Sequence, residues 1–175
     1  MTTARVQPGR DGYGLMRGSF GDVMFAVTRV AIGFIFLWAF LDKLFGLGKS
    51  TPSEKSWLNG GSPTAGYLSN LKGTFADTFS GIAGKAWADW IFMLGLLGLG
   101  LALILGIGMM VAAIAGTVLL VLMWMTALPI SSNPFLDDHI IYALVIIAIA
   151  ATGAGLRYGL APWWRRVTAG QRWLW

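Results

Sequence analysis

Two apolar stretches separated by three residues decide the fold of this chain. They are residues 90–105 (WIFMLGLLGLGLALIL) and residues 109–128 (MMVAAIAGTVLLVLMWMTAL), with Gly106-Ile107-Gly108 between them. A helix of about 20 apolar residues spans the roughly 30 Å hydrocarbon core of a membrane, and both stretches in one helix would be about twice that length. Because paired glycines permit a sharp turn, the pattern predicts a tight hairpin of two helices.

The remainder of the chain also indicates a membrane protein. Hydrophobic residues make up 56% of the 175 residues and charged residues only 12%, with a mean hydropathy of +0.67, whereas soluble domains average about 25% charged residues. Two further apolar stretches, residues 23–45 and 140–158, bring the predicted spans to four. The predicted fold class is therefore all-α, an integral membrane four-helix transmembrane bundle over residues 22–158.

Small residues recur along the central hairpin at a spacing of four. Gly98, Ala102 and Gly106 do so in the first stretch, and Ala112 and Gly116 in the second. Small residues at this spacing let membrane helices approach closely, so the pattern predicts a compact bundle.

Arginines at the two ends predict the orientation of the spans. They occur in an N-terminal arm, residues 1–21, and near a tail, residues 159–175, that alternates tryptophan with arginine: Arg5, Arg10, Arg17, Arg157, Arg165, Arg166 and Arg172. Four spans place both ends on one side, and the positive-inside rule makes that side the cytoplasm. The expected location is the plasma membrane of a prokaryotic cell. The net charge of +5 then reflects topology, and no nucleic-acid partner is predicted.

The outer loop, residues 46–89, contains a helical pattern of its own. Its apolar side chains recur at three- and four-residue steps at Tyr67, Leu68, Leu71, Phe75, Phe79 and Ile82. This spacing predicts a short amphipathic helix on the outer surface of the bundle, starting near Ser62-Pro63. Residues 46–61, rich in glycine, serine, proline and lysine, are expected to be irregular.

The few polar residues beside the spans are the candidates for a site, because ionisable groups are costly in a membrane. The segment 133–139 (NPFLDDH) begins with Asn133 and contains the only histidine, His139. Asp42 and Lys43 close the first span at the same predicted face, and Arg29 lies deeper in that span. Trp38 and Trp124 lie one or two turns inside this face of the bundle.

Each candidate also has a purely structural interpretation. Asp137 or Asp138 can cap the fourth helix, and Lys43 can be a cation favoured at a helix C-terminus. Arg29 can extend its side chain to the lipid headgroups. These interpretations remain open at the level of sequence.

The combination of lysine, histidine, carboxylate and aromatic side chains at an apolar mouth suits a flat lipophilic ligand such as a quinone. Lysine, histidine or asparagine can donate to its carbonyl oxygens, and a histidine beside a carboxylate can exchange protons near neutral pH. Other redox groups lack ligands: one histidine cannot hold a bis-His haem, and without cysteine there is no iron–sulfur cluster. Zinc would need Asp137, Asp138 and His139 to converge, and we expect the adjacent aspartates to diverge, so no metal is predicted.

Residues 28–44 (TRVAIGFIFLWAFLDKL) resemble the first span of DoxX/DoxD-type membrane proteins, with an arginine, a glycine four residues later, aromatics and a closing lysine-leucine. Residues 94–106 resemble the glycine- and leucine-rich second span of that family, and residues 133–139 resemble its asparagine-proline, aspartate, histidine segment before the fourth span. The resemblance implies quinone-linked redox chemistry, with DoxD-type proteins acting as a subunit of thiosulfate:quinone oxidoreductase. Carried over to this chain, it favours Arg29, Lys43, Asn133, Asp138 and His139 as site residues.

The leading hypothesis is a quinone-interacting membrane subunit of an oxidoreductase, taking electrons from a small sulfur compound on the outer face. Menaquinone or ubiquinone would be the cofactor, and a partner subunit or a second copy is expected. Lys43 and His139 would bind or protonate the quinone oxygens, and Asp138 would orient His139 or relay its proton. Arg29 would hold the span packing or the inner end of the site, and the remaining residues of the site would be Trp38, Asp42, Trp124 and Asn133. The alternative is a non-catalytic structural or assembly subunit of a membrane complex, and a small transporter is a third hypothesis, which the four spans without an inverted repeat disfavour.

Overall fold

The computed structural model describes residues 20–131, 133–153, 158–169 and 171–174, and this part of the chain is helical. The four longest helices are α1 (Phe20–Phe45), α4 (Ala86–Leu105), α5 (Met109–Ala127) and α6 (Asp138–Thr152). α1, α4 and α5 are long and apolar enough to cross a membrane, which agrees with the predicted class of helical membrane protein. α6 has 15 residues and is a shorter apolar helix, so the fourth span stays a prediction.

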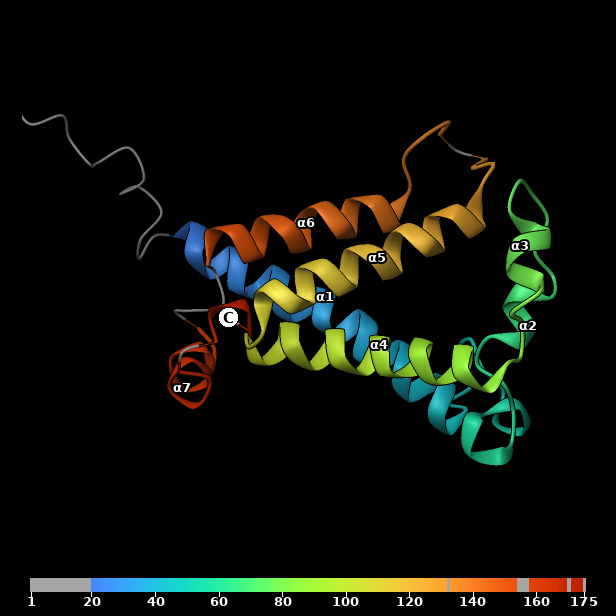
Figure 1. Ribbon diagram of the computed structural model, residues 1–175, viewed down its shortest axis with the longest axis horizontal. Helices are drawn as coiled ribbons and strands as arrows, with labels where there is room; N and C mark the ends of the chain where they lie inside the picture. The colour runs from blue at the N-terminus through green and yellow to red at the C-terminus, as the bar shows by residue number, and fades with distance from the viewer. Residues whose placement is uncertain (1–19, 132, 154–157, 170, 175) are drawn as a thin grey trace, which may run out of the picture.

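The long helices pack as two pairs joined at the centre. α1 packs mainly on α4 and α6 mainly on α5, while the α4–α5 hairpin connects the pairs and α1 touches α6 only lightly (Figure 1). Gly106 and Gly108 have φ of +70° and +57° in the turn between α4 and α5. Left-handed backbone of this kind favours glycine, which explains why the glycine pair forms the predicted hairpin turn.

The close approach of α1 to α4 depends on two glycines. A Cβ atom at Gly100 would lie 2.8 Å from the backbone nitrogen of Leu37, and one at Gly33 would lie 2.9 Å from the backbone nitrogen of Ile104. Backbone atoms cannot move aside as a flexible side chain can, so only glycine allows this packing.

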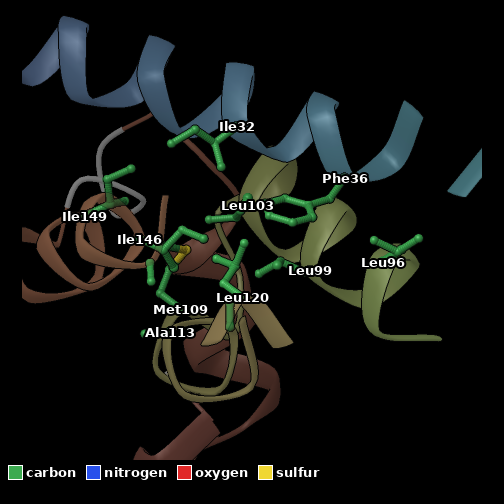
Figure 2. Close-up of a cluster of buried hydrophobic side chains, with 12 residues drawn as sticks. Ile32, Phe36, Leu96, Leu99, Leu103, Met109, Ala113, Leu120, Ile146 and Ile149 are labelled. Carbon is green, nitrogen blue, oxygen red and sulfur yellow. The ribbon is translucent and has the colours of Figure 1, made fainter. Parts of the chain in front are cut away.

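The buried core lies where all four long helices meet. Figure 2 shows Ile32 and Phe36 of α1 beside Leu99 and Leu103 of α4, with side chains of α5 and α6 completing the cluster. Its labelled members from those two helices are Met109, Ala113, Leu120, Ile146 and Ile149.

The outer loop is more ordered than its composition suggests, and its predicted single helix is two short ones. The loop contains η2 (Ser53–Lys55), η3 (Trp57–Asn59), α2 (Ala65–Leu68) and α3 (Ala76–Ser80). The chain turns between α2 and α3 at Gly73, whose φ is +148° and where a Cβ atom would lie 2.0 Å from the Leu128 carbonyl oxygen. The loop thus touches the C-terminal end of α5, and this contact interrupts the helical pattern.

The tail after α6 forms α7 (Ala161–Val167) and η4 (Arg172–Leu174), which lie beside the α4–α5 turn (Figure 1). The Leu160 amide donates to the Leu105 carbonyl oxygen at 2.8 Å, and the Trp164 indole donates to the Leu174 carbonyl oxygen at 2.6 Å. The predicted N-terminal arm, residues 1–21, falls almost entirely outside the described residues.

Candidate functional site

His139 lies in the first turn of α6, held by the residue that caps the helix. Asp137 is the N-cap: its Oδ1 accepts from the Ile140 amide at 3.3 Å, and its Oδ2 lies 2.7 Å from His139 Nδ1. The side chains are partly buried, with 20% of His139 and 11% of Asp137 exposed. One carboxylate therefore both satisfies a free helix N–H and orients the imidazole.

The preceding segment is folded back onto α5. Asn133 Oδ1 accepts from the amides of Phe135 and Leu136 at 2.9 and 3.0 Å, and the Trp124 indole donates to the Phe135 carbonyl oxygen at 3.0 Å. Asn133 and Trp124, both predicted to line a ligand site, here position the backbone that leads into α6. The expected proximity of Trp124 to the NPFLDDH segment is thereby present in the structure.

Asp138 has a different environment from Asp137. Its side chain is 68% exposed and its Oδ1 lies 3.6 Å from His139 Nδ1, so Asp137, and not Asp138 as expected, makes the short contact. The ligand atoms of Asp137, Asp138 and His139 nevertheless lie within 4.8 Å of one another, so the two aspartates do not diverge as the sequence suggested. In this arrangement the Asp137 carboxylate already caps α6 and contacts the imidazole.

The end of α1 contains the other predicted site residues. Asp42 is 1% exposed and accepts from the Lys49 amide at 3.1 Å, the Ser50 amide at 2.9 Å and the Ser50 hydroxyl at 2.6 Å. Its carboxylate thus orders the chain as it leaves the helix. Lys43 places its Nζ 5.9 Å from the centre of the Phe92 ring, within range of a cation–π interaction.

The two groups of predicted residues do not come together. Lys43, Asp42 and Trp38 belong to the α1–α4 pair, whereas His139 and Trp124 belong to the α5–α6 pair. Figure 1 shows the end of α1 and the start of α6 well apart at the same end of the molecule. Lys43 therefore does not lie opposite His139, because the helix pairs diverge toward this end.

Arg29 has an internal position and does not extend to solvent. It is 0% exposed and donates to the carbonyl oxygens of Leu103, Ile104 (3.1 Å) and Tyr158 (2.8 Å). The last four carbonyl oxygens of a helix lack partners within it. At the end of α4, the Ala102 carbonyl oxygen accepts from the Gly106 and Ile107 amides. Arg29 donates to the carbonyl oxygens of Leu103 and Ile104. The Leu160 amide donates to the carbonyl oxygen of Leu105. Arg29 therefore completes the C-terminal cap of α4.

Sequence reasoning missed a second buried carboxylate at the start of α4. Asp89 Oδ1 accepts from the Ser62 hydroxyl at 2.9 Å, the Thr64 amide at 3.0 Å and the Thr64 hydroxyl at 2.6 Å. It anchors the middle of the outer loop as Asp42 anchors its beginning. The available sequence signal was an aspartate in the first turn of a predicted span, preceded by a loop rich in serine and threonine.

A separate cavity of about 330 Å³ lies at the opposite end of the α4–α5 hairpin, near the tail. Its walls are apolar side chains of α4 and α5, and Trp164 and Leu174 lie at one end. None of the residues predicted to bind a cofactor lines it.

Comparison of the chain with protein-family models, with curated proteins and with solved structures finds no match.

Proposed function

We propose that this protein is a quinone-interacting membrane subunit of an oxidoreductase of the DoxX/DoxD type. In this proposal α1, α4, α5 and α6 form a four-span bundle in a prokaryotic plasma membrane, with both termini in the cytoplasm and α2 and α3 on the outer surface. The observation that carries the proposal is the 2.7 Å contact between His139 Nδ1 and Asp137, at the end of an apolar helix pair.

The residues around His139 fit the polar head of a quinone. Asp137 engages Nδ1 and fixes the plane of the imidazole, so Nε2 is the atom that can meet a quinone oxygen. Phe135 and Leu136 are exposed and apolar, which suits contact with a lipophilic ring. A bound quinone would accept two electrons and two protons.

His139 and Asp137 would move the protons in this scheme. The imidazolium form of His139 would donate its Nε2 proton to a quinone oxygen and become neutral imidazole, and the Asp137 carboxylate would stabilise the imidazolium before the transfer. The electrons would come from a donor oxidised by a partner subunit, for which a small sulfur compound remains the expected class. Lys43, with Trp38 and Asp42, becomes a residue to test independently of His139, because it belongs to the other helix pair.

The test is quinone binding by the full chain in lipid nanodiscs prepared without quinone. We expect menaquinone or ubiquinone to bind the wild type, and His139→Ala to weaken binding roughly tenfold, equivalent to about 1.4 kcal/mol. Asp138→Ala is the matched control, because its exposed carboxylate makes no short contact with the imidazole. Equal binding by wild type and His139→Ala would overturn the site.

The alternative of a non-catalytic assembly subunit draws on a different observation. Arg29, Asp42 and Asp89 are all buried and hydrogen-bonded to backbone groups of this chain, which is how polar residues stabilise a scaffold. Purification in mild detergent distinguishes the two functions. A stable partner without extractable quinone would favour assembly, and bound quinone lost in His139→Ala would favour the redox subunit.

A further inference from the structure

The α4–α5 cavity is a groove confined to the half of the hairpin that contains the turn. Its lining residues on α4 begin at Leu94 and continue to the turn at Ile107 and Gly108, which corresponds to roughly 15–20 Å of helix. One leaflet of the hydrocarbon core is about 15 Å deep, half of about 30 Å. A second membrane helix would follow the hairpin across both leaflets, whereas a groove of this length matches a single acyl chain.

Small residues make the groove. Gly98 and Ala102 of α4 face Ala112 and Ala115 of α5 among its walls, and a Cβ atom at Gly98 would have no neighbour within 4 Å. Gly98 thus leaves room that the protein itself does not fill. Gly116, by contrast, packs against Leu99, where a Cβ atom would lie 2.9 Å from Cδ1.

Two residues of the tail line the end of the groove, and exposed arginines follow one of them in the sequence. Trp164 and Leu174 line this end and are tied together by the 2.6 Å hydrogen bond from the indole to the Leu174 carbonyl oxygen. Arg165 and Arg166 follow Trp164 on α7 and are both exposed. Guanidinium groups at the membrane surface attract phosphate, and basic pockets beside membrane helices bind anionic lipid headgroups.

We propose that this groove binds one anionic phospholipid, with an acyl chain between α4 and α5 and its phosphate at Arg165 and Arg166. This site is independent of the proposed quinone site, which lies at the other end of the helices. The lipid would seal the open face of the α4–α5 hairpin and hold the tail on the leaflet it shares with that turn.

The test is native mass spectrometry of the full chain after reconstitution with phosphatidylglycerol or phosphatidylcholine. We expect one tightly retained phosphatidylglycerol per chain and at least tenfold weaker retention of phosphatidylcholine. Gly98→Leu fills the groove and should abolish retention of phosphatidylglycerol. Ala148→Leu adds the same side chain to an exposed position of α6 that does not line the groove, and should retain the lipid as the wild type does.

A double Arg165→Gln/Arg166→Gln variant tests the headgroup contact and should remove the preference for phosphatidylglycerol. Thermal unfolding of each variant in detergent verifies that it is folded before lipids are compared. Retention of phosphatidylglycerol by Gly98→Leu at the wild-type level would overturn the proposal. A change from dimer to monomer in Gly98→Leu with unchanged lipid retention would also overturn it, and would identify the groove as a contact between copies of the chain.

Discussion

Arg29 and His139 occupy opposite ends of the helices and differ in their burial and in the partners of their side chains. Arg29 is fully buried and donates to three backbone carbonyl oxygens. His139 is one-fifth exposed, and its contact in the described part of the chain is with the Asp137 and Asp138 carboxylates. The difference teaches that an ionisable residue is not functional merely because placing its side chain in a membrane costs free energy. A fully buried polar group that donates to backbone carbonyl oxygens stabilises the fold, and a partly exposed group is the better candidate for a ligand.

The largest expected effect is at Arg29, the fully buried residue of this comparison. Arg29→Met removes the donor to the buried Leu103 carbonyl oxygen and to the partly buried ones of Ile104 and Tyr158, and a buried group left without its partner costs about 1–3 kcal/mol. We expect a loss of roughly 3 kcal/mol or more in unfolding free energy, measured by denaturant titration in mixed micelles. Arg166→Met, at an exposed position of α7, should change stability by less than about 0.5 kcal/mol. Comparable losses in both variants would show that Arg29 is not the cap of α4.

The next effect separates two glycines on the same helix. Gly100→Ala forces a methyl group against the Leu37 backbone and should cost about 1–3 kcal/mol through separation of α1 from α4. The methyl group of Gly98→Ala would point into open space, so this variant should lose no measurable unfolding free energy. Thermal unfolding of the two single variants under identical detergent conditions makes the comparison, and equal melting temperatures would contradict the described helix packing.

Asp42 tests whether the outer end has a buried, hydrogen-bonded residue of its own. Asp42→Ala removes the acceptor for the Lys49 and Ser50 amides, so we expect a loss of about 1–2 kcal/mol. Hydrogen–deuterium exchange should accelerate at those two amides before the rest of the chain. Glu54→Ala in the same loop serves as the control. Unchanged protection of the Lys49 and Ser50 amides from exchange in Asp42→Ala would show that the Asp42 carboxylate does not order the loop.

The smallest stability effect is expected at His139. Asp137→Ala should cost about 1 kcal/mol because an N-cap is lost, and His139→Ala should cost less because its side chain supports no backbone group in the described structure. Far-ultraviolet circular dichroism during heating measures both. A destabilisation by His139→Ala that matches Arg29→Met would place His139 among the structural residues and weaken the quinone proposal.

Much of the helical layout follows from local sequence, and much of the site does not. The apolar stretches predicted helices that end at Phe45, Leu105 and Ala127 to within a residue, since length and hydropathy are local properties. The prediction of a single surface helix in the outer loop was wrong, because the chain turns at Gly73, where it contacts the end of α5. Such a long-range contact is not visible in the local sequence. Lys43 and His139 were expected together because both lie at one end, but sharing an end does not make two helices neighbours.

The sequence by itself determined that this is a helical membrane protein, that Gly106 and Gly108 turn the central hairpin, and that polar groups are few. Hydropathy and glycine geometry depend on the residues themselves, so no tertiary information is needed for these conclusions. Only the tertiary structure decided that Arg29 caps α4, that Asp137 orients His139, and that Gly100 is packed while Gly98 is open. Each of these depends on which helix faces which, and that arrangement arises from packing between residues far apart in the chain.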